Sequence, residues 1–170
     1  GGGQRGGEER EQQAGHDQSD QYLVEQLSLL LCESLEAVRE MGLLDVSFLQ
    51  CLPTKELNKY PDQWMFRSLH ENVCKTFEQG EYLPTDREGE YASANNALLA
   101  CGEKLRPLFQ SNMLEIIWGS PKKWLSGEIT TDKTPDLRQY LLKELEVKEV
   151  DPWDIIGRLT DSFFQQQTLE

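Results

Sequence analysis

Histidine is scarce in this sequence, and with it the usual means of activating a nucleophile. Only 2 of the 170 residues are histidines, His16 and His70, and His16 lies in a segment without large apolar side chains. His70 is thus the one histidine expected in the folded part, and no serine or cysteine is marked as its nucleophile. The phosphate-binding motif G-x-x-x-x-G-K-[ST] is absent, and the glycines within residues 1–7 follow no strand. The residues therefore predict neither a hydrolytic triad nor a phosphate loop.

Long apolar runs and positive charge are also in short supply. The longest apolar run, residues 27–32, is interrupted by Ser28 and falls far short of the ~20 residues of a membrane-spanning helix. Lysine and arginine number 17 against 30 aspartates and glutamates, which gives a net charge of −13 and a pI of about 4.6. Such a chain is poorly matched to a nucleic-acid backbone or an anionic membrane. We expect neither as a partner, and we expect the acidic surface to serve mainly for solvation.

The cysteines do not form a metal-binding pattern. They occupy positions 32, 51, 74 and 101 without a C-x-x-C pair, and no signal peptide precedes them. A disulfide framework is possible from their number, but reduced thiols in an intracellular, cytoplasmic protein fit the sequence better. His70 and Cys74 are four residues apart on one predicted helix face, yet two ligands are too few for a metal site. We expect a partly exposed histidine beside a buried thiol, and no cofactor.

The first 18 residues differ in composition from the others. They are rich in Gly, Glu and Gln and contain no large apolar residue, so we predict a disordered tail over residues 1–18. Residues 19–170 are predicted to form a single, mainly helical domain. Because the sequence does not start with methionine, we expect it to be a fragment of a larger protein.

Apolar spacing and capping signals predict several short helices. The predicted segments are residues 19–41 with Gly42 as the stop, one or two turns within 43–52, residues 61–78 closed by Gly80, helical pieces at 94–100 and 103–109, a helix from Thr134-Pro135, and a helix from Asp151-Pro152. Residues 113–118 fit either a helix or a strand. Residues 146–150 are too short for more than a strand-like link.

Residues 81–92 predict one small antiparallel β-hairpin. Tyr82 and Leu83 begin an apolar stretch, a turn is expected at residues 86–89, and Tyr91 lies in the second strand. With the helices, this gives a fold class of α+β, mainly helical, with several short helices and this one hairpin. A hairpin presents a surface but brings no catalytic chemistry of its own, so we expect it to build the scaffold.

Aromatic and basic residues in and after the hairpin are the candidates for a recognition surface. The possible interaction residues are Tyr82, Tyr91, Trp118, Lys122, Lys123 and Trp124. For Trp118, Trp124 and Trp153 the competing interpretation is burial in the core, and it is favoured because each has apolar neighbours. The sequence predicts no catalytic, cofactor-binding or metal-binding residue.

Residues 82–166 carry a series of motifs in a specific order. These are Leu83-Pro84-Thr85, Gly89, Ser93-Ala94, Ala97-Leu98-Leu99, Trp124-Leu125-Ser126, Ile129-Thr130, Thr134-Pro135, Leu137-Arg138, Tyr140-Leu141, Glu144-Leu145, Val147, Val150-Asp151-Pro152 and Leu159-Thr160. With these motifs the chain resembles the region that follows the ATP-binding module in sacsin-like and NO VEIN-like proteins, which are relatives of heat-shock chaperones. The likeness covers about half of the chain, and it consists mainly of caps, turns and core positions.

The resemblance implies a non-catalytic scaffold or interdomain segment of a chaperone-type ATPase. In that family ATP binding belongs to the preceding module, whose motifs have no counterpart here, so we expect no catalysis by this chain. The implied partner is a protein, either the neighbouring ATP-binding module of the same parent chain or a client. Two alternatives stay open: a stand-alone adaptor that binds through the hairpin and residues 118–124, and a carboxylate-dependent, metal-assisted hydrolase.

Overall fold

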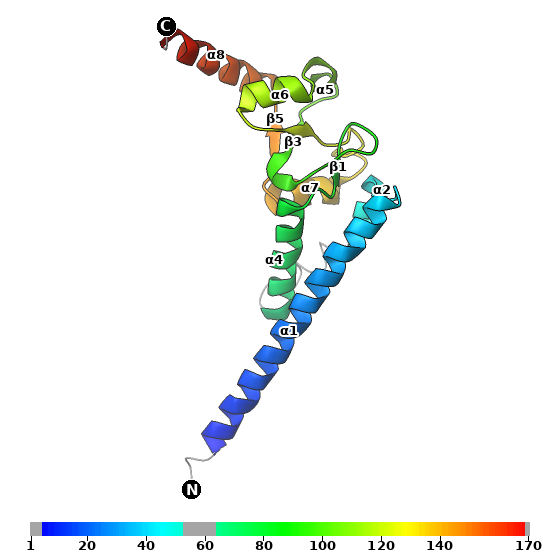
Figure 1. The fold of residues 1–170 in the computed structure, drawn as a ribbon, viewed down its shortest axis with the longest axis vertical. Coiled ribbons are helices and arrows are strands. Elements are labelled where there is room, and N and C mark those ends of the chain that lie inside the picture. The colour runs from blue at the N-terminus through cyan, green and yellow to red at the C-terminus, as the bar shows by residue number, and fades with distance from the viewer. Residues whose placement is uncertain (1–4, 53–63, 169–170) are drawn as a thin grey trace.

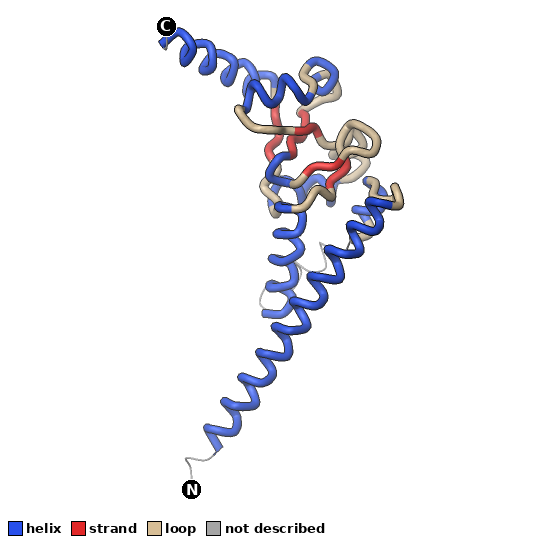
Figure 2. The backbone as a smooth tube through the Cα atoms, viewed as in Figure 1, coloured by secondary structure: helices blue, strands red, loops and turns tan. Residues whose placement is uncertain are grey.

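The computed structural model describes residues 5–52 and 64–168, and Figure 1 shows their arrangement. In chain order the elements are α1 (Arg5–Glu40), α2 (Val46–Gln50), α4 (Trp64–Gln79), β1 (Leu83–Pro84), β2 (Tyr91–Ala92), the 3-10 helix η1 (Ala94–Asn96), β3 (Ala97–Ala100), α5 (Leu105–Leu108), α6 (Ser111–Trp118), β4 (Lys123–Trp124), α7 (Pro135–Lys143), β5 (Lys148–Val150) and α8 (Pro152–Thr168). Helices dominate, and the strands gather in the middle of the molecule (Figure 2). The predicted fold class, mainly helical α+β with a small antiparallel hairpin, is confirmed.

The first helix is longer than the sequence predicts. α1 begins at Arg5, whereas disorder is predicted over residues 1–18 and a helix start at Ser19 or Asp20; residues 1–4 lie outside the described part. Residues 5–18 lack large apolar side chains, but their glutamates, glutamines and arginines favour helix and outnumber the three glycines, which do not. Extending an existing helix adds a hydrogen bond per residue without a new nucleation step. The polar extension therefore needs no core of its own.

α1 and α4 lie side by side below the strands (Figure 1). As predicted, α1 stops before Gly42, which has φ 72°. The predicted start of the second helix at Pro61 lies outside the described residues, and the helix ends just before Gly80 as predicted. A side chain at Gly80 would collide with the ring of Tyr82. The glycine thus lets the chain turn closely from α4 toward the hairpin.

β1 and β2 form the predicted hairpin. They pair antiparallel, with Leu83 opposite Ala92 and Pro84 opposite Tyr91. Gly89 in the connecting turn has φ 80°, a conformation that side chains other than glycine adopt rarely. Because each strand has only two residues, the hairpin depends on packing against the rest of the domain.

A parallel three-stranded sheet, in the order β4-β3-β5, is not predicted by the sequence. Leu98 in the central strand lies beside Trp124 of β4 and Lys148 of β5. The helical piece predicted at residues 94–100 is wrong beyond its first turn, since η1 leads directly into β3. Alanine and leucine favour helix locally by a few tenths of a kcal/mol, and burial between two strands outweighs such a preference. The strand-like link predicted at residues 146–150 is confirmed as β5.

The parallel sheet separates two hydrophobic cores. Side chains alternate along β3, so Leu98 enters one core and Leu99 the other. The first core, with Leu99, includes Leu35, Val73, Phe77, Tyr82, Leu83, Leu125, Tyr140, Leu141 and Val147. The second core, with Leu98, contains Leu105, Leu114, Ile117, Trp124, Val150 and Ile155. Helices α1, α2, α4 and α7 therefore build one layer, and α5, α6 and the start of α8 build the other.

The chain segments that follow β3 and β4 leave the sheet toward opposite faces. α5 and α6 connect β3 to β4 over the second core, and α7 connects β4 to β5 over the first. In Figure 1, α5 and α6 lie above the strands and α7 lies below them. In open parallel sheets, the crevice at the carboxyl ends of two such strands is where ligands commonly bind.

The later helices start close to the predicted positions. Residues 113–118, which fit a helix or a strand by sequence, are helical in α6. α7 begins at Pro135 as predicted, but the Thr134 hydroxyl does not cap it. That hydroxyl instead donates to the Thr130 carbonyl oxygen at 3.2 Å and accepts from the Thr130 N–H at 3.0 Å. Thr134 thus closes the loop before the helix, which corrects the predicted cap.

Asp151 caps α8, as the sequence predicts. The Asp154 N–H donates to Asp151 Oδ1 at 2.8 Å, and the Asp151 N–H donates to Asp154 Oδ2 at 3.0 Å. This reciprocal arrangement is a capping box built from two aspartates. The backbone hydrogen bond from Asp151 lowers the pKa of Asp154.

Candidate functional site

Two of the six predicted interaction residues lie in the core. Tyr82 and Trp124 are buried, so neither is available as a surface residue. This corrects the interaction role predicted for both and confirms the favoured interpretation, burial in the core, for Trp124. The Tyr82 hydroxyl donates to Glu36 Oε1 at 3.1 Å, and the Trp124 indole N–H donates to the Phe109 carbonyl oxygen. Each ring therefore packs among apolar neighbours while its polar atom finds a partner inside the domain.

The other four predicted interaction residues are half-buried. They are Tyr91, Trp118, Lys122 and Lys123. The two ammonium groups donate to backbone carbonyls, Lys122 to Asn95 at 2.7 Å and Lys123 to Tyr91 at 3.2 Å. The guanidinium of Arg158 lies 4.6 Å from the Trp118 ring centroid, so this ring is partly covered by its own chain. A recognition role for these four residues stays a prediction.

Trp153, for which burial is the favoured interpretation, is largely exposed and belongs to an apolar side of α8. The exposed fractions are 78% for Trp153, 53% for Ile156, 45% for Leu159, 58% for Phe163 and 60% for Phe164. At ~100° per residue these positions fall within one sector about 140° wide. In Figure 1 the C-terminal part of α8 extends away from the rest of the molecule. α8 is thus an amphipathic helix whose apolar side faces solvent, the reverse of a helix that covers a core.

The inner side of α8 attaches the helix to the second core. Ile155 is buried in the second core, and Arg158 and Ser162 are half-buried. These residues recur every three to four positions on the side opposite Trp153 and Phe164. The helix is therefore anchored through this inner side, and the side chains of the outer stripe are 45–78% exposed.

A buried polar cluster joins α4 to α7. His70 Nε2 lies 3.1 Å from Glu144 Oε2 and 3.7 Å from Cys74 Sγ. The Cys74 sulfur lies in turn 3.5 Å from the Tyr140 hydroxyl. The predicted partly exposed histidine beside a buried thiol is confirmed, with 11% of the His70 side chain exposed. Its two partners, from α7 and the residue after it, could not be predicted from helix spacing alone.

This polar cluster is suited to holding two helices together rather than to catalysis. Burial raises the pKa of the Cys74 thiol, so the nucleophilic thiolate is disfavoured. Burial also raises the pKa of Tyr140. His70 Nδ1 is buried without a hydrogen-bond partner among the described residues. Within the same residues no group of three His, Cys, Asp or Glu side chains can hold a metal ion. The geometry therefore gives the metal-assisted hydrolase no support in the described part of the chain.

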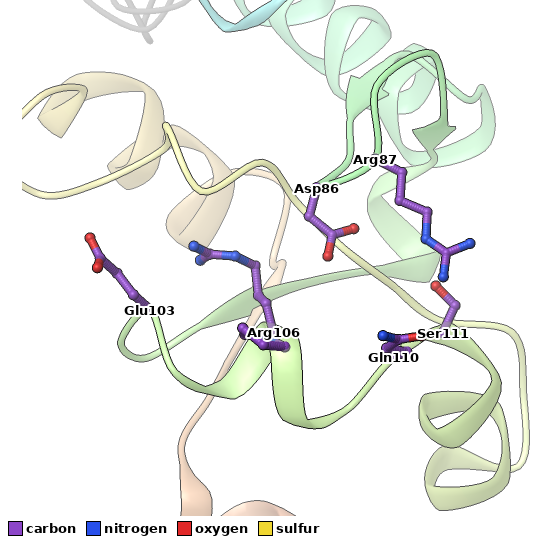
Figure 3. A pocket seen from close by; sticks show the side chains of 7 residues that line it. Asp86, Arg87, Glu103, Arg106, Gln110 and Ser111 are labelled. Carbon is purple, nitrogen blue, oxygen red and sulfur yellow. The ribbon is translucent and has the colours of Figure 1, made fainter.

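A cavity of about 280 Å³ opens at the carboxyl ends of β3 and β4 (Figure 3). Its lining consists of Asp86, Arg87, Glu103, Arg106, Pro107, Gln110 and Ser111. The hairpin turn supplies the first two residues, and the segment that follows β3 supplies the others. Asp86 is fixed to β4 because its N–H donates to the Trp124 carbonyl oxygen at 3.1 Å. Sequence reasoning missed this cavity because its two segments share no motif.

No protein-family model, curated protein or solved structure matches this chain. Among the helices of residues 5–52 and 64–168, none is long and apolar enough to cross a membrane. The likeness of residues 82–166 to the sacsin-like region therefore stays a prediction. Three features remain as sources of function: the apolar side of α8, the buried polar cluster and the charged cavity.

Proposed function

We propose that this chain is a non-catalytic interaction segment of a sacsin-like parent protein, and that it docks through α8 into an apolar groove on a neighbouring module. The observation that carries the proposal is the stripe of five large apolar side chains exposed on one side of this helix. Single exposed apolar residues are common on protein surfaces. A continuous stripe at helical spacing is typical of a helix that lies in a groove.

The size of the stripe favours a groove over a second copy of this chain. Scaled by their exposed fractions, three aromatic and two aliphatic side chains present an apolar area on the order of 500 Å². This lies near the upper end of the largest patch on a typical monomer, roughly 300–600 Å². Two such faces in contact would fall short of the ~800 Å² per partner of a standard interface. A groove that also encloses the borders of the helix would bury more.

Charge also favours a partner of different composition. Asp154 and Asp161 border the apolar stripe, and the whole chain carries a net charge of −13. Two copies would bring like charges together, whereas a groove with basic residues along its rim would be complementary. We propose that the neighbouring ATP-binding module of a sacsin-like parent protein provides this groove.

The test compares the 170-residue chain with a longer native chain that includes the module encoded before Gly1. We expect amide hydrogen exchange over residues 153–164 to slow in the longer chain and the emission of Trp153 to shift to shorter wavelength, because the partner excludes water. Phe163→Asp should reverse both effects. Gln165→Asp, which adds the same charge on the polar side of the helix, should preserve them.

Two results would contradict the proposal. Equal exchange rates and equal Trp153 emission in both chains would show that the neighbouring module does not cover α8. A concentration-dependent dimer of the 170-residue chain, dissolved by Phe163→Asp in sedimentation experiments, would assign the stripe to a second copy instead.

A further inference from the structure

We infer that the cavity at the carboxyl ends of β3 and β4 binds a small zwitterionic ligand of the α-amino-acid type, with Arg106 facing its carboxylate and Asp86 facing its ammonium group. This inference goes beyond the docking role of α8 and rests on different residues. It is argued from the position of the cavity, the charges that line it and the way those charges are held.

The cavity lies where the fold leaves room for a ligand. The connections after β3 and β4 diverge to opposite faces of the sheet, which leaves a crevice at the two strand ends, and the hairpin turn borders this crevice. Glu103 and Arg106 come from the first connection, and Asp86 is bonded to the last residue of β4. The volume of about 280 Å³ is more than ten times the roughly 15 Å³ that a single bound water needs. That is space for an amino acid.

The charges that line the cavity are balanced, and they do not pair with one another. Two carboxylates, Asp86 and Glu103, and two guanidinium groups, Arg87 and Arg106, line it. None of the four forms an ion pair with another of them in the described structure; Arg87 reaches only Glu90, at 4.0 Å. Figure 3 shows Asp86 reaching the cavity from the hairpin turn and Arg106 reaching it from the facing segment after β3, with the Arg106 guanidinium turned toward the side of Glu103. A ligand with separated opposite charges complements this lining, whereas a bare anion or cation would leave like charges uncompensated.

The Arg106 guanidinium and the backbone of Asp86 are held in place before any ligand binds. The Arg106 guanidinium packs on the backbone at Gly127, where the Cβ of any other residue would collide with it. Arg106 makes no hydrogen bond or ion pair with another described residue, so its donors are available. Loss of water raises the pKa of Asp86, while Arg87 and Arg106 act in the opposite direction. An ammonium group bound in the cavity would stabilise the charged form of the Asp86 carboxylate.

Binding is tested by titrating the isotope-labelled 170-residue chain with pools of the common L-amino acids and then with single members. We expect saturable shifts of backbone amide resonances confined to residues 86–87, 103–111 and 124–127 for at least one amino acid at about 10 mM, ten times a millimolar Kd. Acetate and methylamine, added singly or together, carry the same charges on separate molecules. They should not reproduce the saturable shifts, because neither spans the cavity.

Three variants separate the ligand contact from the fold. Arg106→Gln and Asp86→Asn should each raise Kd by roughly tenfold, since each removes one charge-assisted hydrogen bond. Gly127→Ala should weaken binding similarly by displacing the Arg106 guanidinium, at little cost in stability because the end of a flexible side chain gives way. Lys104→Gln removes a neighbouring charge that does not line the cavity, and its Kd should equal that of the native chain.

The inference is overturned by any of three results. In the first, the amides around the cavity do not shift with any amino acid. In the second, acetate alone produces the same saturable shifts, which would make this a simple anion site. In the third, Arg106→Gln and Gly127→Ala leave Kd unchanged while both variants keep the unfolding free energy of the native chain. Because Phe163 lies outside this cavity, Phe163→Asp should leave amino-acid binding intact, and so each proposal can fail without the other.

Discussion

Leu98 and Leu99 allow the two-core architecture to be tested with two neighbouring substitutions. Both are 2% exposed, and they belong to different hydrophobic cores. We expect Leu98→Ala and Leu99→Ala to destabilise the domain strongly and to a similar degree. The expectation depends on β3 being a strand covered on both faces, because an exposed or half-exposed segment would tolerate at least one of the changes.

The magnitude follows from the atoms removed. Each substitution deletes three carbon atoms from a buried side chain, which loses about 2.4 kcal/mol of transfer free energy at about 0.8 kcal/mol per methylene. A cavity that closes only partly adds on the order of 1 kcal/mol. We therefore expect each variant to lose about 3 kcal/mol of unfolding free energy. Asn95→Ala and Asn96→Ala, at exposed positions of η1 in the same segment, should change it by less than about 0.5 kcal/mol.

Equilibrium urea unfolding followed by far-ultraviolet circular dichroism measures these differences. The slope of free energy against urea should stay constant across the variants, since they bury the same backbone. A loss below about 1 kcal/mol for either leucine would refute the two-core arrangement at β3. A loss at Asn95 or Asn96 as large as at the leucines would show that the burial pattern of this segment is wrong.

Three further predictions concern single side chains. Trp124→Phe removes the indole N–H that donates to Phe109 and leaves that carbonyl oxygen unpaired, so unfolding free energy should fall by about 1–3 kcal/mol in the same urea assay; an unchanged value would contradict this hydrogen bond. With iodoacetamide at about pH 8, the exposed Cys51 should be alkylated before Cys74, whose pKa is raised by burial; equal rates in peptide mass spectrometry would argue against a buried Cys74. The backbone hydrogen bond at the start of α8 lowers the Asp154 pKa below its ordinary 3.8, so the resulting stabilisation is present above that value and is lost as pH falls through the lower, folded-state pKa. Carboxyl NMR titration of Asp154 should show this low value, and a midpoint at or above 3.8 would contradict it.

Local signals accounted for much of the secondary structure. Leu137, Leu141 and Leu145 repeat every four residues, and all three are buried as the spacing predicts. The cap at Asp151 and the turn glycine at position 89 were likewise readable, since each acts through bonds within a few residues of itself. The polar residues 5–18 show the limit of composition, because their helix continues one that apolar residues begin.

The positions of the candidate sites depend on contacts between residues that are far apart in the chain, and these contacts could not be predicted from the sequence. Trp124 and Trp153 both have apolar neighbours in the chain, yet one is 1% and the other 78% exposed. The difference arises because the Trp124 side chain packs in the second core, whereas Trp153 lies on the outer side of the first turn of α8. The cavity at Asp86 and Arg106 requires the hairpin turn to contact the end of β4, and that contact joins residues 86 and 124, which are 38 positions apart in the chain.

Most helix positions, the hairpin, the acidic character and the lack of the usual nucleophile and phosphate motifs can be read from the chain alone, because propensities, turns and caps are local. That residues 97–100 form a strand, which aromatic rings are covered, and that opposite charges line one cavity follow only from the packed fold. Burial and charge placement are properties of residues distant in the chain. Their energies depend on which surfaces the fold brings together, and no window of neighbouring residues contains that information.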